Sequence, residues 1–214
     1  MKTGWLCRFG LGILLILSIM GVAQASPLPA VVLPEAVEVG KARIEGELAA
    51  SGMKEMPYVV VHIGSQSMYL FQSGRLLRQY PVSTAARGIG NRAGSYQTPL
   101  GLHRVAQKFG HGQPKGMSFV ARKPTGQIVE LIKEPVSTGR DDITSRILWL
   151  DGLEEGINRG PGIDSKSRYI YIHGTVEEGL IGQPASKGCV RMLNDDVIDL
   201  FEQLPEGALV NIVE

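Results

Sequence analysis

Two residues carry the chemistry that this sequence allows, a cysteine and a histidine. Cys189 stands in the segment 186–192 (SKGCVRM), a short distance after His173. A thiol becomes a good nucleophile when a neighbouring base or cation stabilises its thiolate. The chain has two cysteines, and we expect the other, Cys7, to be removed with an N-terminal segment. A lone thiol forms no intramolecular disulfide, so we predict that Cys189 is a nucleophile and that His173 moves its proton.

Groups beside this pair would complete an acyl-transfer site. Gly188 would let a substrate carbonyl approach the backbone, and the N–H groups of Gly188 and Cys189 are candidates for binding an oxyanion. The carbonyl of Gly174 could orient the His173 ring, while Lys187 and an imidazolium would favour the thiolate. On spacing alone a structural interpretation stays open, because a cysteine in a loop is often only a packing residue.

Other polar residues near the motif have two interpretations. Ser186 either shapes the loop around the thiol or only hydrogen-bonds within it, and Arg191 either contacts a substrate carboxylate or makes an ion pair. Asp141 and Asp142 are more typical of solvated charges than of an acid–base pair. The sequence lacks the paired, closely spaced cysteine and histidine ligands typical of zinc sites, so we predict no metal and no other cofactor.

Residues 1–25 have the organisation of a secretory signal peptide. Lys2 and Arg8 give a positively charged start, residues 9–22 are almost all apolar, and residues 23–25 (AQA) form a small-x-small cleavage site. The apolar run is shorter than the roughly 20 residues that span a bilayer. We therefore expect cleavage rather than a membrane anchor, so that the chain meets the membrane only transiently during export.

The mature chain has the size and charge of an ordinary single domain. Removal of the signal peptide leaves 189 of the 214 residues, enough for one domain with its own core. It also leaves 20 Lys and Arg against 21 Asp and Glu, a net charge of −1. So little net charge gives no field that steers nucleic acid, and we predict no nucleic-acid partner. Abundant glycine, 27 residues, and few helical patterns predict a mainly β fold.

We divide the mature chain into an N-terminal extension (26–56) and a catalytic domain (57–213). A short helix over 35–50 is possible in the extension, but its two internal glycines disfavour it. The extension is either a linker or packs on the domain, and the sequence does not decide between the two.

Within the domain, β-branched and aromatic runs alternate with glycine-rich loops. The runs predict strands at 58–63, 68–71, 75–82, 100–106, 146–150, 168–173 and 208–213. Long loops are expected over 85–99 and 109–118. The cysteine motif is followed by a predicted helix with Asn194 as its N-cap. His173 is thus expected at the end of a strand and Cys189 on a loop.

The cysteine and histidine motifs together resemble the signature of L,D-transpeptidases with a YkuD-type catalytic domain. The matching residues are His173-Gly174-Thr175, the segment 186–192 and Asn194. Two further segments, 94–101 (GSYQTPLG) and 147–152 (ILWLDG), also resemble this family. The resemblance extends over residues 57–213, nearly the whole mature chain.

The resemblance implies a single mostly β domain, a sandwich or cradle with a short helix after the catalytic loop. It implies a reaction on bacterial peptidoglycan stem peptides: Cys189 attacks the carbonyl of a diaminopimelate, D-alanine leaves, and an amine resolves the thioester. His173 would be the general base and acid, oriented by Gly174. Ser186 and Gly188 would shape the loop and the oxyanion site.

The resemblance gives less definite roles to the remaining residues of the motif. Arg191 and Asn194 would hold the motif in place, with Arg191 also a candidate for meeting a substrate carboxylate. Lys187 departs from the family, which often has histidine before the Gly-Cys pair. A lysine cannot accept a proton near neutral pH, so the role of this position is open.

Three functions are compatible with these residues. If the attacking amine belongs to another stem peptide, the product is a 3-3 crosslink; if it belongs to a lipoprotein lysine, a protein is anchored to the wall. Water in place of the amine would make the enzyme an L,D-carboxypeptidase. A non-catalytic peptidoglycan-binding module is the alternative from another class, although binding alone needs no thiol.

The signal peptide and this substrate together predict a periplasmic location, with the extracellular cell wall as the alternative.

Overall fold

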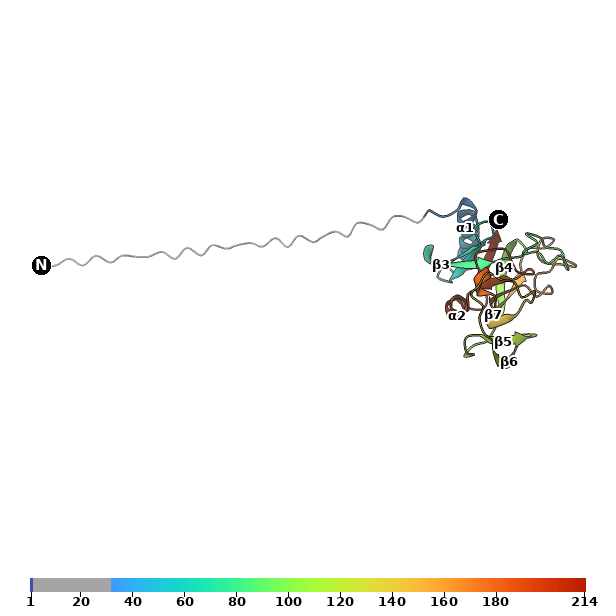
Figure 1. Cartoon of the computed structure of the whole chain (residues 1–214). Helices are drawn as coiled ribbons and strands as arrows, with labels where there is room; N and C mark the ends of the chain where they lie inside the picture. Colours follow the sequence, from blue (N-terminus) through green and yellow to red (C-terminus); the bar gives the residue numbers. More distant parts are fainter. Residues whose placement is uncertain (2–31) are drawn as a thin grey trace. The chain divides into compact units, whose positions relative to one another are not determined.

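The computed structural model describes Met1 and residues 32–214, so the predicted signal peptide and the first residues of the extension (26–31) lie outside the described residues. Residues Leu33–Glu214 form one compact unit in which strands dominate (Figure 1). The mainly β single domain predicted from the sequence is confirmed.

Strands follow one another along most of this unit, with a helix near each end. The strands are β1 (Tyr58–His62), β2 (Ser67–Gln72), β3 (Arg75–Ser83), β4 (Gly101–Phe109), β5 (Met117–Val120), β6 (Lys123–Ile128), β7 (Ile143–Gly152), β8 (Tyr171–Thr175), β9 (Val190–Met192) and β10 (Leu209–Val213). The helices are α1 (Glu35–Ala50), the 3-10 turn η1 (Glu178–Leu180) and α2 (Asn194–Gln203).

The sheet closes on itself because β4 has a partner on each side. It pairs with β10 and also with β7, and the strands between these two follow the order β10-β1-β2-β3-β9-β8-β7. The ring encloses the main core, since residues that alternate along each strand point inward. In β1, Val59 and Val61 lie in this core, whereas Tyr58 and Val60 belong to an outer cluster.

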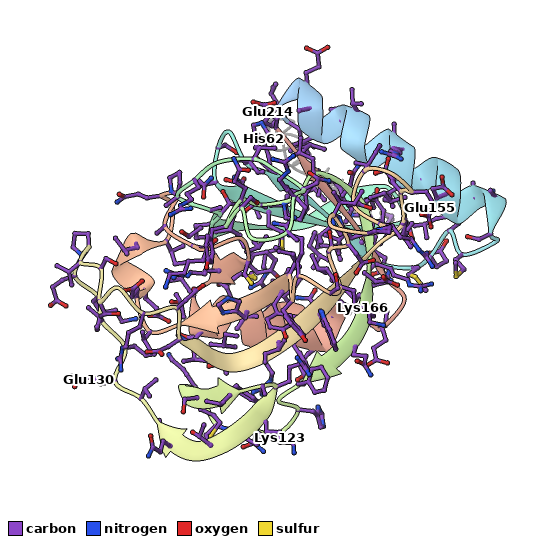
Figure 2. All side chains as sticks on the ribbon, turned by 90° about the vertical axis from the view of Figure 1, so that its right-hand side faces the viewer. His62, Lys123, Glu130, Glu155, Lys166 and Glu214 are labelled. Atoms are coloured by element: carbon purple, nitrogen blue, oxygen red, sulfur yellow. The ribbon has the colours of Figure 1, made fainter. Side chains whose placement is uncertain are left out.

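Helix α1 covers the outer cluster, so this part of the extension packs on the domain. Its buried residues Val37, Gly40, Ile44 and Leu48 share one face, and Figure 2 shows the helix lying across the end of the unit where His62 and Glu214 are labelled. Gly40 is needed for the close approach, because a Cβ there would lie 3.1 Å from side-chain carbons of Val60 and Val213. One of the two glycines that disfavour the helix by propensity thus allows the helix to pack closely on the sheet.

Helix α2 closes the main core on the other side, with Val197, Leu200 and Phe201 buried. The prediction that Asn194 caps this helix is wrong. Asn194 is the first helical residue, and the residue before it makes no side-chain cap. The Asn194 side chain is instead fully buried and hydrogen-bonded to strand β7 and to Glu178. Polar groups buried away from water need such partners within the protein.

A hairpin of β5 and β6 extends the sheet beyond the ring. The loop predicted over 109–118 covers only its first two residues, and the sequence analysis predicted no element for the rest. β5 pairs with the start of β7, through Ser118 opposite Thr144. Ala121 and Arg122 form its turn with positive φ values of 47° and 67°, as a type I′ hairpin turn requires. Figure 2 shows Lys123 in this outlying hairpin. None of the helices within residues 32–214 is long and apolar enough to cross a membrane.

Candidate active site

The register of two parallel strands brings the histidine and the cysteine onto one face of the sheet. In the pairing of β8 with β9, Ile172 lies opposite Val190 and His173 opposite Arg191. Ile172 and Val190 point into the main core. Cys189 therefore lies on the outer face with His173, because successive residues of a strand alternate between faces. His173 is in the middle of β8, not at a strand end as predicted, since the strand begins at Tyr171.

The His173 ring is buried, neutral and fixed in one tautomer. Its Nδ1 lies 2.7 Å from the carbonyl oxygen of Gly174, which only accepts hydrogen bonds, so Nδ1 carries the proton. Nε2 is then an acceptor, and it is buried without a hydrogen-bond partner among the described residues. Burial lowers the pKa of His173. A buried, unprotonated nitrogen facing a pocket is the arrangement expected of a general base.

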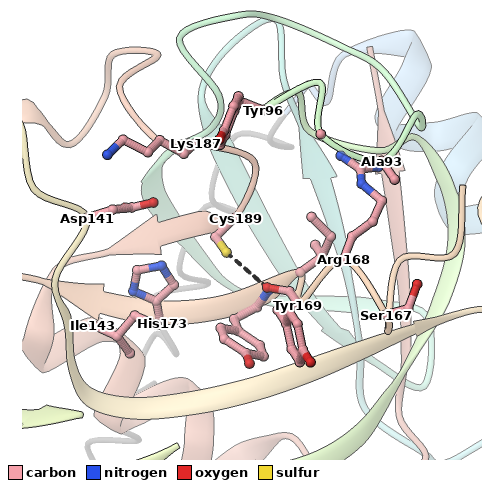
Figure 3. Close-up of a pocket in the computed structure, with 13 residues that line it drawn as sticks. Ala93, Tyr96, Asp141, Ile143, Ser167, Arg168, Tyr169, His173, Lys187 and Cys189 are labelled. Carbon is pink, nitrogen blue, oxygen red and sulfur yellow. Dashed lines mark hydrogen bonds between the residues drawn. The ribbon is translucent and has the colours of Figure 1, made fainter. Parts of the chain in front are cut away.

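The Cys189 thiol lies in the same pocket and is protonated at rest. Sγ donates to the carbonyl of Tyr169 at 3.5 Å, the contact drawn in Figure 3, and accepts the N–H of Tyr171 at 3.4 Å. Burial, with the nearby Asp141 carboxylate, raises the pKa of Cys189 to about 12. The expectation that an imidazolium and Lys187 favour a resting thiolate is therefore wrong.

Lys187 lies away from the sulfur. Its Nζ donates to the carbonyl of Gly139 at 3.3 Å, across the mouth of the pocket, and Figure 3 shows its ammonium directed away from Cys189. The lysine therefore joins the cysteine loop to the segment before β7 and does not stabilise charge at Sγ.

Ser186 and Gly188 shape the loop that delivers the thiol. Ser186 Oγ donates to the carbonyl of Cys189 at 2.6 Å and accepts the N–H of Gly188 at 3.2 Å. Buried Thr98 donates to the carbonyl of Gly188 at 3.0 Å. The N–H of Gly188 is therefore engaged and does not face a substrate, contrary to the prediction. The N–H of Cys189 makes none of the loop hydrogen bonds within residues 32–214, so it is the backbone donor left for an oxyanion.

Arg191 is buried beneath the site, only 1% exposed. Its Nη1 donates to Glu177 Oε2 at 2.8 Å, and its Nε and Nη2 donate to Asp141 Oδ1 at 2.9 and 2.5 Å. Glu177 also accepts the N–H of Thr138, at 2.5 Å. These bonds clamp the segment before β7 against the two site strands. Of the two predicted roles, the geometry favours the ion pair and gives the guanidinium no path to a substrate.

The pocket has a volume of ≈ 460 Å³ and is lined by both predicted catalytic side chains. Its walls come from segments distant in sequence, which Figure 3 shows around Cys189: Ala93, Tyr96, Asp141, Ile143, Arg168, Tyr169 and Lys187. Arg168 is half-buried and donates to the carbonyls of Gly90 and Gln97. It thereby joins the 85–99 loop to the strand region that carries the site.

The turn of the β5–β6 hairpin also reaches this wall. Arg122 Nη1 donates to the hydroxyl of Tyr171 at 2.9 Å, and its guanidinium lies over the rings of Trp149 and Tyr169 at 4.4 and 5.4 Å. Such contacts hold aromatic side chains in place. Sequence reasoning did not single out Arg122 or Arg168, which join the site only through tertiary structure. It interpreted Asp141 as a solvated charge, and this is wrong, because Asp141 is paired with buried Arg191 and lines the pocket.

Comparison with known proteins agrees with this geometry. The family model described as the L,D-transpeptidase catalytic domain (YkuD) matches residues 56–212. The chain belongs to this family. The L,D-transpeptidase domain thus takes in β1 to β9 and all but the last residue of β10, and α1 lies before the matched residues. The family predicted from the cysteine and histidine motifs is confirmed.

The curated relatives of this L,D-transpeptidase domain are similar to it over only part of their own lengths. It is 25% identical over 156 residues to the Escherichia coli (strain K12) protein "Probable L,D-transpeptidase YcfS", over 72% of this chain and 43% of that protein. It is 43% identical over 47 residues to "Probable L,D-transpeptidase ErfK/SrfK" of Salmonella typhimurium, over 22% of this chain and 15% of that protein. The chain thus spans less than half the length of these relatives.

Solved structures give weaker likenesses to this L,D-transpeptidase domain. An L,D-transpeptidase from Mycobacterium smegmatis aligns with a TM-score of 0.46 at 14% identity, over 74% of this chain and 58% of that one. The L,D-transpeptidase of Xylanimonas cellulosilytica aligns with a TM-score of 0.42 at 19% identity, over 74% of this chain and 61% of that one.

Proposed function

We propose that this protein is a cysteine-dependent L,D-transpeptidase that acts on peptidoglycan stem peptides through a thioester on Cys189. One observation carries the proposal: Nε2 of His173 is buried without a partner in the described chain, and His173 lines the pocket that holds the thiol. An unpartnered buried acceptor lowers the stability of the fold, and a role in the reaction would explain why it is retained. Removing the thiol proton would give it one.

In the first half-reaction, Cys189 exchanges an amide bond for a thioester. The Sγ proton passes to Nε2 of His173, Sγ bonds the diaminopimelate carbonyl carbon, and the N–H of Cys189 binds the developing oxyanion. The bond to the D-alanine nitrogen then breaks, and Nε2 returns the proton to that nitrogen. Proton transfer that accompanies substrate binding suits a thiol that is neutral at rest. The Gly174 carbonyl stabilises the imidazolium formed between the two transfers.

In the second half-reaction an amine takes the place of D-alanine. An amine from another stem peptide gives a 3-3 crosslink, and a lipoprotein lysine gives an anchored protein. We place both reactions in the periplasm, in keeping with the predicted signal peptide, and the extracellular wall is the alternative. Water as the acceptor would give the carboxypeptidase.

Intact-protein mass spectrometry tests this function directly. The mature protein is mixed with a tetrapeptide that contains diaminopimelate followed by D-alanine, beside a Cys189→Ala variant. We expect an adduct that lacks D-alanine in the parent protein alone. If neither an adduct nor D-alanine release is found, the proposed function is wrong, and wall binding by the Cys189→Ala variant would then favour the binding module. When an amine is then added, an amide product indicates transfer and a hydrolysed peptide indicates hydrolysis.

A further inference from the structure

One carboxylate in the pocket has a free oxygen. Asp141 receives both of its hydrogen bonds from Arg191 at Oδ1, and no hydrogen bond in the described part of the chain ends on Oδ2. Its side chain is 24% exposed and lines the pocket. Figure 3 shows Asp141 on the same side of Cys189 as His173, with its carboxylate end directed toward the hollow.

The anchoring of Asp141 leaves this region with a negative charge. Arg191 is the one cation paired with Asp141, and it also pairs with the buried carboxylate of Glu177. Two carboxylates therefore share one guanidinium. The other pocket cations do not pair with Asp141. Arg168 donates to the carbonyls of Gly90 and Gln97 and acts on Cys189 only electrostatically, and Lys187 donates to the carbonyl of Gly139.

A second group in the same pocket also lacks a partner. Nε2 of His173 is fully buried and has no hydrogen-bond partner among the described residues. Asp141, His173 and Cys189 line the same pocket, and Asp141 and Arg191 act electrostatically on the base and the thiol in opposite directions. A negative charge near a thiol hinders ionisation, so Asp141 does not serve to activate the nucleophile.

The reaction with an amine does have a use for a negative charge at this place. When a neutral amine bonds the thioester carbon, its nitrogen becomes positively charged before it loses a proton. A fixed carboxylate aimed at that nitrogen stabilises the transition state, whereas attack by a neutral water gains less. Resting on the proposed function, we infer that Asp141 is the residue that receives the attacking nitrogen and selects an amine acceptor over water.

Protons balance in this step. The acceptor arrives as an ammonium beside Oδ2 and loses one proton to solvent. Its nitrogen bonds the thioester carbon, the bond from carbon to Sγ breaks, and the nitrogen's second proton passes through Nε2 of His173 to Sγ. The products are an amide and the neutral thiol of Cys189. The leaving nitrogen of D-alanine passes through the same position in the first half-reaction, in reverse.

The test measures how the thioester divides between an amine and water. Because Asp141 also acts on an amine leaving group, the donor is a stem depsipeptide with D-lactate in place of D-alanine, which acylates without releasing an amine. Acceptors are a D-amino acid or water, and the readout is the ratio of amide to hydrolysed product. For Asp141→Asn we expect this ratio to fall about tenfold or more, the size of a lost charge-assisted hydrogen bond. Acyl-enzyme formation from the depsipeptide is followed in parallel, so that a change in acylation is measured apart from the change in this ratio.

Glu177→Gln is the matched control, because it removes the other carboxylate of Arg191 without facing the pocket. If Asp141 only held Arg191, both variants would change the ratio alike. We expect Glu177→Gln to alter the overall rate and leave the ratio near that of the parent, and Asp141→Glu to restore the ratio in part. In the parent, 1 M sodium chloride should also lower the ratio by screening the ammonium, which supplies a readout if Asp141→Asn does not fold.

The outcomes separate the two proposals. An equal ratio in parent and Asp141→Asn, with acyl-enzyme formed in both, overturns the role of Asp141 and leaves the proposed function standing. If the parent forms no acyl-enzyme from either donor, the proposed function fails and the role of Asp141 fails with it.

Discussion

The carbonyl oxygen of Gly174 lies 2.7 Å from Nδ1 of His173, so the ring is held by the main chain of the next residue. In many hydrolytic sites a carboxylate has this role, and it adds a charge that raises the basicity of the ring. A neutral carbonyl holds the tautomer without that charge. The result is a neutral imidazole opposite a neutral thiol, and this pairing determines how the site responds to reagents.

We predict that the resting thiol reacts slowly with iodoacetamide. With a pKa of about 12, Cys189 is almost entirely protonated at pH 7, whereas a free thiol is a few per cent thiolate. Alkylation should therefore be at least about a hundredfold slower than that of free cysteine. Mass spectrometry over time measures the rate, with Cys189→Ser as the unreactive control. A rate equal to that of free cysteine would contradict the neutral pair.

We predict that acid weakens the fold through His103, which lies outside the site. This ring is fully buried between the Gly101 carbonyl and Ser165 Oγ, and burial lowers its pKa to about 4. The unfolded chain binds the proton near pH 6.5 and the folded chain does not, so stability falls as pH drops from 6.5 to 4. The loss is about 3 kcal/mol over this window.

Urea unfolding at pH 7 and pH 4.5 measures this loss. His103→Gln should show a smaller difference between the two pH values than the parent, because glutamine does not titrate. An equal difference in parent and variant would assign the acid sensitivity to other groups.

We predict that Arg191→Gln is strongly destabilising. The variant leaves buried Glu177 and half-buried Asp141 without their cation, and breaking such a pair costs about 3–5 kcal/mol in unfolding free energy. Arg140→Gln removes an exposed ion pair with Asp142 and should cost less than about 1 kcal/mol. Thermal and urea denaturation compare the two. Equal losses would show that the Arg191 network contributes no more than a surface contact.

We predict opposite effects for the two glycines of α1. A Cβ at Gly40 would lie 3.1 Å from two valine carbons of the sheet, while one at Gly46 meets nothing within 4 Å. Gly40→Ala should therefore cost about 1–3 kcal/mol by overpacking, and Gly46→Ala should stabilise by roughly 0.5–1 kcal/mol. Urea unfolding of both variants measures the difference, and a loss for Gly46→Ala would contradict the packing described.

The sequence predicted the parts of the site that lie within one motif. Local sequence patterns predict the cysteine motif, the strand before it and the strand after α2. The pairing of β8 with β9 then places His173 and Cys189 on the same face of the sheet. The ionisation of the thiol could not be predicted in this way. It depends on burial by distant segments and on Asp141, which no local pattern connects to Cys189.

Local patterns also misled where a side chain had a tertiary partner. Asn194 matches a helix cap by type and position, but buried acceptors and donors around it determine its contacts. Gly40 weakened the helix prediction because propensity takes no account of the sheet that the helix meets. The β5–β6 hairpin was missed because β6 is exposed along its length and lacks the alternation that marks a strand.

The double pairing of β4 also determines the order in which the domain can be completed. β10 lies between β1 and β4 in the ring, although its residues follow the cysteine motif in the chain. Until β10 is added, β1 and β4 each expose an unpaired edge, which is a ready template for association with another chain. While a ribosome still holds residues 209–213, the strand that closes the ring cannot pair, so the strands next to Cys189 and His173 are supported by a closed ring only after these residues are released.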